Sequence, residues 1–247
     1  MNIMIELKEF DNYATIRIMR EEKANAMNLD LIDEISAAVD SIEKKKNIIS
    51  VIITGSGKFF SAGGDLSEML KLDENSGRIF SLKGQKLMDS IEGSEKIYIA
   101  ALNGPAYGGG MELALACDIR IASRDVKMGQ TEINVGLVTG WGGAERLIKY
   151  VGKSIASYLL LTGAVLDAES AYKFGIIHKI SDNPFDDAVK ISQDLSKKNP
   201  DALRAYKHML NIISFDLESI YFGKIVSSQN GKEAINAFFE KRVPNFK

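Results

Sequence analysis

The chain has 247 residues, of which 45% are hydrophobic and 26% charged, a balance typical of a globular protein rather than a disordered one. Its 31 basic and 33 acidic residues give a net charge of −2, so no overall positive field favours nucleic acid. The single cysteine, Cys117, cannot form a disulfide within the chain, and no apolar run reaches the ~20 residues that cross a bilayer. We therefore expect a cytoplasmic protein that binds neither nucleic acid nor membrane.

The first half of the sequence alternates short strands with helices. A helix is expected from Asn28, a good cap residue, because the apolar positions after it recur every three or four residues. The predicted elements, in chain order, are a hairpin over residues 1–20, this helix, a buried strand at 48–54, a helical region to about 95, a strand at 97–102, a helix at about 111–116 and a strand at 119–123. This alternation predicts an α/β core.

The last quarter of the sequence has a different character. After about Pro184 the residue patterns of 188–195, 202–213 and 217–227 are helical, and no clear strand follows. We therefore expect an α/β core with the substrate site over residues 1–186 and a helical C-terminal segment over residues 187–247.

Histidine is scarce, which restricts the acid–base chemistry that the chain can use. Only His178 and His208 occur, and neither lies beside a candidate nucleophile or metal ligand in the sequence. We interpret both as structural. Since histidine is the usual general base near neutral pH, an enzyme with this sequence is expected to use carboxyl groups instead.

The glycine-rich loops do not match nucleotide-binding or hydrolase motifs. Phe59 follows Gly55-Ser56-Gly57-Lys58 where a phosphate-binding loop needs Ser or Thr, and Leu113 stands at the last position of a would-be G-x-G-x-x-G. The sequence holds no G-x-S-x-G and no cysteine/histidine grouping typical of zinc. These patterns argue against kinase, dehydrogenase, hydrolase and metalloenzyme functions together.

Two glycine segments, at residues 61–66 and 107–112, lie where the chain leaves an extended stretch and enters a helix. The first backbone N–H groups of a helix are free, and the positive end of its dipole favours an anionic oxygen. Two such turns that face each other could donate to one oxygen and form an oxyanion hole. The alternative is that these glycines only make tight turns.

Several stretches carry a family resemblance. They are Lys58–Leu66, Ile99–Asp118, Met128–Glu132, Gly140–Gly143, Arg146–Leu147, Leu161–Gly163 and Ala237–Arg242. With these stretches the sequence resembles the crotonase (enoyl-CoA hydratase/isomerase) superfamily over nearly its whole length. The resemblance implies an α/β fold, a crotonase-like spiral of ββα units with a helical C-terminal trimerisation segment. It also implies a homotrimer or a hexamer, that is, a dimer of trimers.

The resemblance implies four catalytic groups. The oxyanion-hole amides fall on Gly64 and Gly109, and the catalytic carboxylates on Glu112 and Glu132. Glu112 is assigned chiefly to activating water and Glu132 chiefly to protonating C2 of an enoyl thioester. Hydratases of the family typically keep both glutamates, while isomerases often keep only the one that matches Glu132.

The resemblance also implies residues that bind the acyl-coenzyme A thioester. They are Lys23, Ala24, Ala62, Gly63, Asp65, Leu66, Gly140, Trp141, Phe238 and Lys241. Phe238 and Lys241 match positions that reach the cofactor of a neighbouring subunit. Coenzyme A is expected only as part of the substrate, with no permanently bound cofactor and no metal.

Two departures from the family pattern flank the expected acyl site. Thr139 stands where the family usually has proline, and Trp141 fills a position that often holds a small residue. Trp141 either shortens the acyl pocket or packs as a structural aromatic. The implied reaction is reversible addition of water to a 2-enoyl-CoA. The alternatives are an isomerase or acyl-CoA decarboxylase of the same superfamily, and then a non-catalytic acyl-CoA-binding or RNA-binding relative.

Overall fold

The computed structural model describes residues 3–212 and 215–246 of the chain. Its main sheet has six strands in the order β1-β2-β3-β4-β6-β9. These are β1 (Ile5–Glu9), β2 (Tyr13–Ile18), β3 (Ser50–Gly55), β4 (Ile97–Leu102), β6 (Ile119–Ser123) and β9 (Lys179–Ser181). Only β1 runs antiparallel to its neighbour, and the other pairs are parallel. The predicted hairpin and the predicted strands at 97–102 and 119–123 are confirmed.

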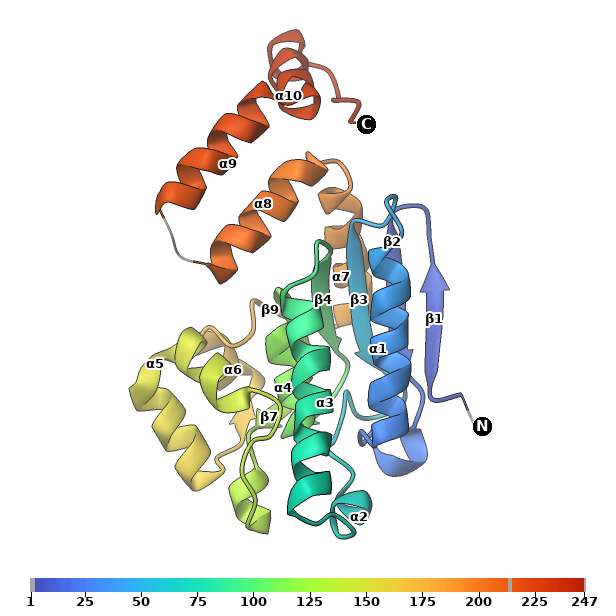
Figure 1. Cartoon of the computed structure of the whole chain (residues 1–247), viewed down its shortest axis with the longest axis vertical. Helices are drawn as coiled ribbons and strands as arrows, with labels where there is room; N and C mark the ends of the chain where they lie inside the picture. Colours follow the sequence, from blue (N-terminus) through green and yellow to red (C-terminus); the bar gives the residue numbers. More distant parts are fainter. Residues whose placement is uncertain (1–2, 213–214, 247) are drawn as a thin grey trace.

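Helices cover both faces of this sheet (Figure 1). On one face lie α1 (Leu29–Glu43) and α3 (Glu74–Glu92), and on the other α7 (Pro184–Leu195) packs through Ala188. The central strand β3 is therefore buried on both sides, as predicted from its β-branched run. The predicted cap is also confirmed, because the side chain of Asn28 accepts a hydrogen bond of 3.0 Å from the amide of Leu31.

A second, smaller sheet brings the glycine run beside the segment that leads to Glu132. It consists of β5 (Ala106–Tyr107), β7 (Lys127–Gly129) and β8 (Leu166–Asp167), with β5 parallel to β7 and β7 antiparallel to β8. The amide of Gly108 donates to the carbonyl of Gly129 at 2.9 Å. This pairing holds the turn after β5 against the end of β7.

The remaining elements of the core are short or surround the second sheet. They are the 3-10 helices η1 (Glu21–Lys23) and η2 (Glu132–Val135), and the helices α2 (Leu66–Met69), α4 (Gly109–Ala116), α5 (Gly143–Thr162) and α6 (Ala168–Lys173). Every residue of α4 is buried. This helix starts two residues earlier than the predicted start at 111, because Gly109 and Gly110 are part of it.

The C-terminal region is helical, as predicted. It contains α8 (Pro200–Asn211), α9 (Phe215–Ser227) and α10 (Gln229–Glu240), and residue 213 of one predicted helix lies outside the described residues. In Figure 1, α9 and α10 stand away from the sheet, at the end opposite α2. The predicted division after residue 186 falls inside α7, which packs on the sheet, and it stays a prediction.

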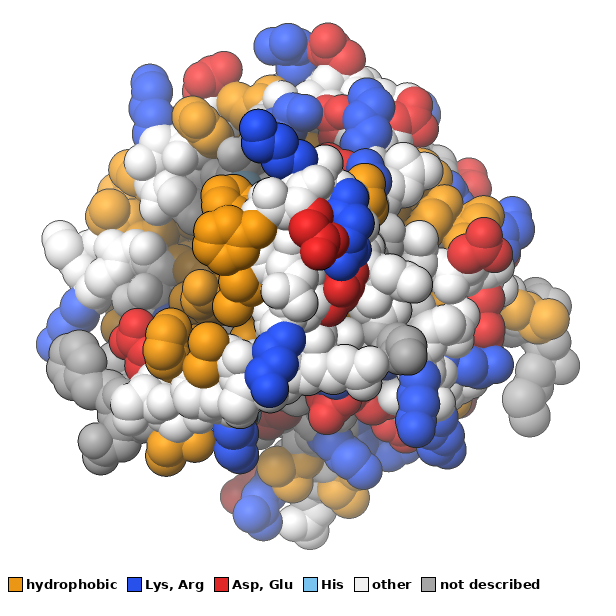
Figure 2. All heavy atoms as spheres, turned by 90° about the horizontal axis from the view of Figure 1, so that it is seen from above, with side chains coloured by type: hydrophobic (Ala, Val, Ile, Leu, Met, Phe, Trp, Pro, Cys, Tyr) orange, Lys and Arg blue, Asp and Glu red, His pale blue; other side chains and the backbone are white. Residues whose placement is uncertain are grey.

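Large apolar side chains are exposed on these C-terminal helices, among them Phe222, Phe238 and Phe239. Figure 2 views the molecule from above, the α10 end of Figure 1, and shows apolar groups between charged ones on that face. Within residues 3–212 and 215–246, no helix has the length and apolar character needed to cross a membrane.

Candidate active site

A cavity of about 460 Å³ opens between α2, the start of α3, the start of α4 and the segment 131–141. All four predicted catalytic residues line it: Gly64, Gly109, Glu112 and Glu132. Five of the predicted substrate-binding residues line it as well: Ala62, Gly63, Leu66, Gly140 and Trp141. Segments that are far apart in the sequence therefore meet at one site.

The two glycine segments contact each other at the cavity wall. Gly63 has a left-handed φ of 98°, and a Cβ there would lie 2.6 Å from the carbonyl oxygen of Tyr107 and 3.1 Å from the amide nitrogen of Gly109. Any larger residue would push the two segments apart. The glycine at 63 is thus required by a close approach of two backbones as well as by its conformation.

The amides of Gly64 and Gly109 are free of protein acceptors in the part of the chain that the structure describes. The amide of Met27 donates to the carbonyl of Gly63, and the carbonyl of Met27 accepts from the amide of Asp65. The N–H of Gly64, which lies between these two residues, therefore points away from Met27. Gly109 is the first residue of α4, and its N–H has no acceptor within the helix. Two unpaired donors therefore line the same cavity.

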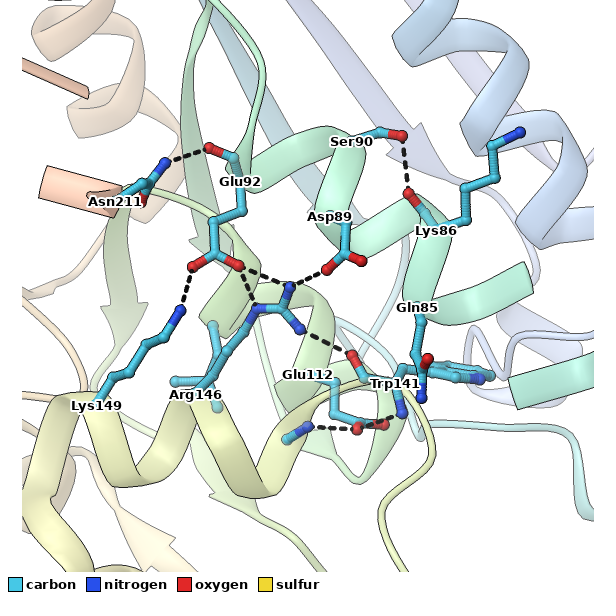
Figure 3. Close-up of polar contacts among 12 residues, drawn as sticks. Gln85, Lys86, Asp89, Ser90, Glu92, Glu112, Trp141, Arg146, Lys149 and Asn211 are labelled. Carbon is cyan, nitrogen blue, oxygen red and sulfur yellow. Dashed lines mark hydrogen bonds and ion pairs between the residues drawn. The ribbon is translucent and has the colours of Figure 1, made fainter. Parts of the chain in front are cut away.

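Glu112 is held deep in the wall by backbone amides. Glu112 is only 2% exposed, and its Oε1 accepts hydrogen bonds from the amides of Trp141 at 2.7 Å and Gly143 at 2.8 Å (Figure 3). Burial raises the pKa of Glu112 to about 7, and the nearby charge of Glu132 contributes to the rise. The two amides and Arg146 oppose it. Near neutral pH this carboxyl can therefore either take up or release a proton.

Glu132 begins η2 and is half-buried. Burial raises its pKa too. When the amide nitrogen of Gln130 faces it, that nitrogen donates to Oε1 at 3.1 Å and to Oε2 at 3.3 Å. Gly108 leaves room for the carboxylate, because a Cβ at that position would lie 3.1 Å from Oε1. The turn that presents the amide of Gly109 also accommodates Glu132.

Trp141 fills the space between α3 and α4 beside the two free amides. A Cβ on Gly109 would lie 2.1 Å from its indole ring, and one on Gly84 would lie 2.2 Å from it. The ring of Phe80 packs against it at 5.5 Å between centroids. Glycines on two helices thus admit this large side chain, which is 2% exposed and narrows the cavity.

The predicted residues Lys23 and Ala24 lie next to the cavity rather than in it. Ala24 has a left-handed φ of 51°, and its carbonyl accepts from the amide of Ala62 at 2.9 Å. Asp65 is buried beneath this wall, where it caps α2 through the amide of Ser67 and forms an ion pair with Arg20 at 2.8 Å. The binding roles of Lys23, Ala24 and Asp65 stay predictions.

Phe238 and Lys241 are not at the cavity. Phe238 is 79% exposed on α10, and Lys241 is its exposed C-terminal cap. Both lie at the end of the molecule opposite α2 (Figure 1). Their predicted contact with coenzyme A would have to be made to a neighbouring subunit, and it stays a prediction.

Both histidines have structural contacts away from the cavity. Nδ1 of His178 accepts from the amide of Arg120 at 3.0 Å, and Nδ1 of His208 lies 3.1 Å from the hydroxyl of Tyr221. Among residues 3–212 and 215–246, no three histidine, cysteine or acidic side chains are grouped as metal ligands.

Sequence reasoning missed two polar residues of the site, Gln130 and Arg146. Both lie in stretches that carry the resemblance, but neither was given a role. Their burial, 1% and 4% exposed, was the missing observation. A buried amide or guanidinium needs partners, so its presence marks a built polar site.

Two free amides and two carboxyls of raised pKa around one cavity define an acid–base enzyme that can stabilise a developing negative charge. Residues 9–247 match the family described as enoyl-CoA hydratase/isomerase. The chain belongs to this family, and the resemblance found in its sequence is confirmed.

Similar proteins agree along the full length of the chain. A crotonyl-CoA hydratase of Syntrophomonas wolfei is 37% identical, covering 99% of this chain and 97% of the relative. A short-chain-enoyl-CoA hydratase of Clostridium acetobutylicum is 35% identical over 100% of this chain and 98% of the relative. The crystal structure of an enoyl-CoA hydratase from Bacillus anthracis superposes with a TM-score of 0.95 at 30% identity, covering 99% of each chain. The predicted crotonase-like α/β fold is confirmed.

Proposed function

We propose that the protein is an enoyl-CoA hydratase, which adds water reversibly across the C2=C3 bond of a 2-enoyl-CoA. One observation carries the proposal: two carboxyls of raised pKa line the same cavity as two unpaired backbone amides. The full-length similarity to proteins named as hydratases supports it.

In this reaction the thioester oxygen accepts hydrogen bonds from Gly64 and Gly109. Water adds its oxygen to C3 and gives a proton to Glu112, and the electron pair of the double bond moves onto the thioester as an enolate. Glu132, protonated at the start, then supplies a proton to C2, and proton exchange between the pair of carboxyls and solvent restores the starting state. The amides stabilise the oxygen where negative charge develops, and so they favour the transition state over the bound substrate.

The surroundings of the two carboxyls suit this division of roles. Oε1 of Glu112 already accepts two amides, which leaves Oε2 as the atom to receive a proton from water. The repulsion between the two carboxylates disfavours their joint ionisation, so the pair readily carries one proton between them. One carboxyl can thus act as base while the other acts as acid.

The cavity favours a short acyl group, such as that of crotonyl-CoA. Trp141 occupies the space between α3 and α4 into which a longer chain could extend. The loop with Lys23 and Ala24, beside Ala62, would hold the coenzyme A part of the substrate. Phe238 and Lys241 of a neighbouring subunit would add contacts in a homotrimer or a hexamer. Addition of water is redox-neutral, so coenzyme A is needed only as part of the substrate.

Incubation with crotonyl-CoA tests this function. The expected result is loss of the absorbance of the conjugated thioester with formation of 3-hydroxybutyryl-CoA. The result that contradicts it is conversion of a 3-enoyl-CoA to a 2-enoyl-CoA without hydration, because that reaction needs a single proton shuttle and no attacking water.

A further inference from the structure

Backbone amides of the loop Thr139–Gly143 bind Glu112, and the side chain of Arg146 binds a carbonyl of the same loop. Nη1 of Arg146 donates to the carbonyl of Trp141 at 2.9 Å, while the backbone amide of Trp141 donates to Oε1 of Glu112 (Figure 3). Gly142 has a left-handed φ of 94°, and a Cβ there would lie 2.2 Å from Nη1. The guanidinium therefore packs directly against the loop that positions the carboxyl.

Arg146 is itself fixed by two acidic residues of α3. Its Nη2 lies 2.7 Å from Oε2 of Glu92 and 2.9 Å from Oδ1 of Asp89, and its Nε lies 3.0 Å from Oε2 of Glu92. All three nitrogens of the guanidinium are thus engaged, and the side chain is 5% exposed. A planar fork in such a setting tolerates few other positions.

The end of α3 that anchors Arg146 is also tied to α8. Asn211 of α8 donates to the carbonyl of Glu92 at 2.7 Å. Lys149, on the same helix as Arg146, lies 3.2 Å from Oε1 of Glu92 on the solvent side, and because its side chain is 61% exposed this ion pair adds little to the position of Glu92. Arg146 therefore links the fixed C-terminal end of α3 to the loop that binds Glu112.

The charge of Arg146 acts in the same sense as its geometry. The charged groups that face Glu112 are Glu132 of η2, which raises the pKa of its carboxyl, and Arg146 of α5, which lowers it. A cation at this place favours the ionised carboxylate that must accept a proton from water.

We propose that Arg146 is a positioning residue for the proposed hydration. By holding the carbonyl of Trp141, its guanidinium orients the loop so that two amides bind Oε1 of Glu112 and Oε2 is presented to water. This inference rests on the proposed function, because the carboxyl that Arg146 orients is the base of that reaction.

Two variants separate the fork from the charge. Arg146→Lys keeps a cation but cannot bind the Trp141 carbonyl and Glu92 together, so kcat should fall by about 10- to 100-fold with KM changed by no more than about twofold. Arg146→Met removes the charge as well, so the acid limb of its kcat/KM against pH should also move to higher pH. The acid limb of Arg146→Lys should stay close to that of the wild type.

Lys149→Gln is the matched control, because it removes a cation from the outer side of Glu92 without touching the loop. Its kcat and pH profile should equal those of the wild type. Wild-type kcat in a folded Arg146→Lys, or a loss confined to KM, would overturn the proposal. If Arg146→Met does not fold, Arg146→Lys decides alone. A wild-type protein that does not hydrate crotonyl-CoA would instead refute the proposed function.

Discussion

The two proposed catalytic carboxyls lie in regions of different construction. Glu112 belongs to α4, a helix buried along its whole length, and two backbone amides fix one of its oxygens. Glu132 starts a short 3-10 helix, and the residues 133–138 that follow it are exposed, with Val138 82% exposed.

This contrast suggests a division of labour within the cavity. The Glu112 side is fixed by the Arg146 contacts and suits the precise orientation of a water molecule. The Glu132 side carries exposed apolar residues such as Val135 and Leu137 that line the cavity and can pack against a bound substrate. Burying them on substrate binding would remove water from the site, which strengthens the interactions inside it.

The sharpest way to test the pairing of these regions is to neutralise each carboxyl. Glu112→Gln and Glu132→Gln should each lower kcat for crotonyl-CoA hydration by about 10²–10⁴, the usual size of an acid–base contribution. The glutamine at 112 can still accept both amides through its Oε1, so the fold should persist. Glu145→Gln, an exposed glutamate at the start of α5, is the matched control. Full turnover in either cavity variant would end the two-carboxyl mechanism.

The Glu112 region should also reveal itself through the pH dependence of stability. The pKa of Glu112 is raised from an ordinary 4.5 to about 7, so the folded protein binds this proton more tightly than the unfolded chain does. The resulting stabilisation is present below about pH 4.5 and is lost as the pH rises through about 7.

Glu112→Gln lacks this titrating group, so its free energy of unfolding does not fall with it. Relative to the wild type, that free energy should rise by up to a few kcal/mol between about pH 5 and about pH 8. Urea unfolding of both proteins across this range measures the difference. Glu132 is present in both proteins, and the loss of its repulsion with the Glu112 carboxylate is part of the difference measured. Parallel curves for the two proteins would mean that Glu112 is not buried as a titrating acid.

A smaller effect, on the preference for acyl chain length, is expected when Trp141 is replaced by a smaller residue. Trp141→Ala opens space beside Gly84 and Gly109, so the ratio of kcat/KM for a 2-octenoyl-CoA to that for crotonyl-CoA should rise about tenfold or more. Because a Trp→Ala change in a core costs about 3–5 kcal/mol, Trp141→Phe provides a milder step in the same direction. An unchanged ratio in both variants would assign Trp141 a purely structural role.

Much of the core could be predicted because its signals are local. The predicted bounds of the strands at 97–102 and 119–123 match the observed ones. The first is a continuous apolar run, and in the second isoleucines alternate with other residues. The cap at Asn28 is likewise a property of a few neighbouring residues. The start of α7 at Pro184 was placed too late, although Asn183 and proline at the first position signal a helix start.

The elements that build the site were harder to predict, because tertiary contacts create them. The strands β5, β7 and β8 have only two or three residues each and exist by pairing with one another. Gly109 and Gly110 look like a loop in the sequence but begin α4, where larger side chains would collide with Trp141 and Ser61.

The site residues divide in the same way. The four predicted catalytic residues follow from the resemblance to the crotonase superfamily, and all four line the cavity. Arg146 carries no local signal of its role, because its acidic partners Asp89 and Glu92 lie on α3, more than fifty residues earlier in the chain. The coenzyme A contacts predicted for Phe238 and Lys241 would need a neighbouring subunit, and they stay predictions.

The most direct test of the central claim is a crystal structure with a bound short acyl-CoA. We expect the thioester oxygen to accept hydrogen bonds of about 2.7–3.1 Å from the amides of both Gly64 and Gly109. The carboxyls of Glu112 and Glu132 should then face C3 and C2 of the acyl group. A thioester oxygen bound to neither amide, or an acyl group outside the cavity lined by Gly64, Gly109, Glu112 and Glu132, would contradict the account.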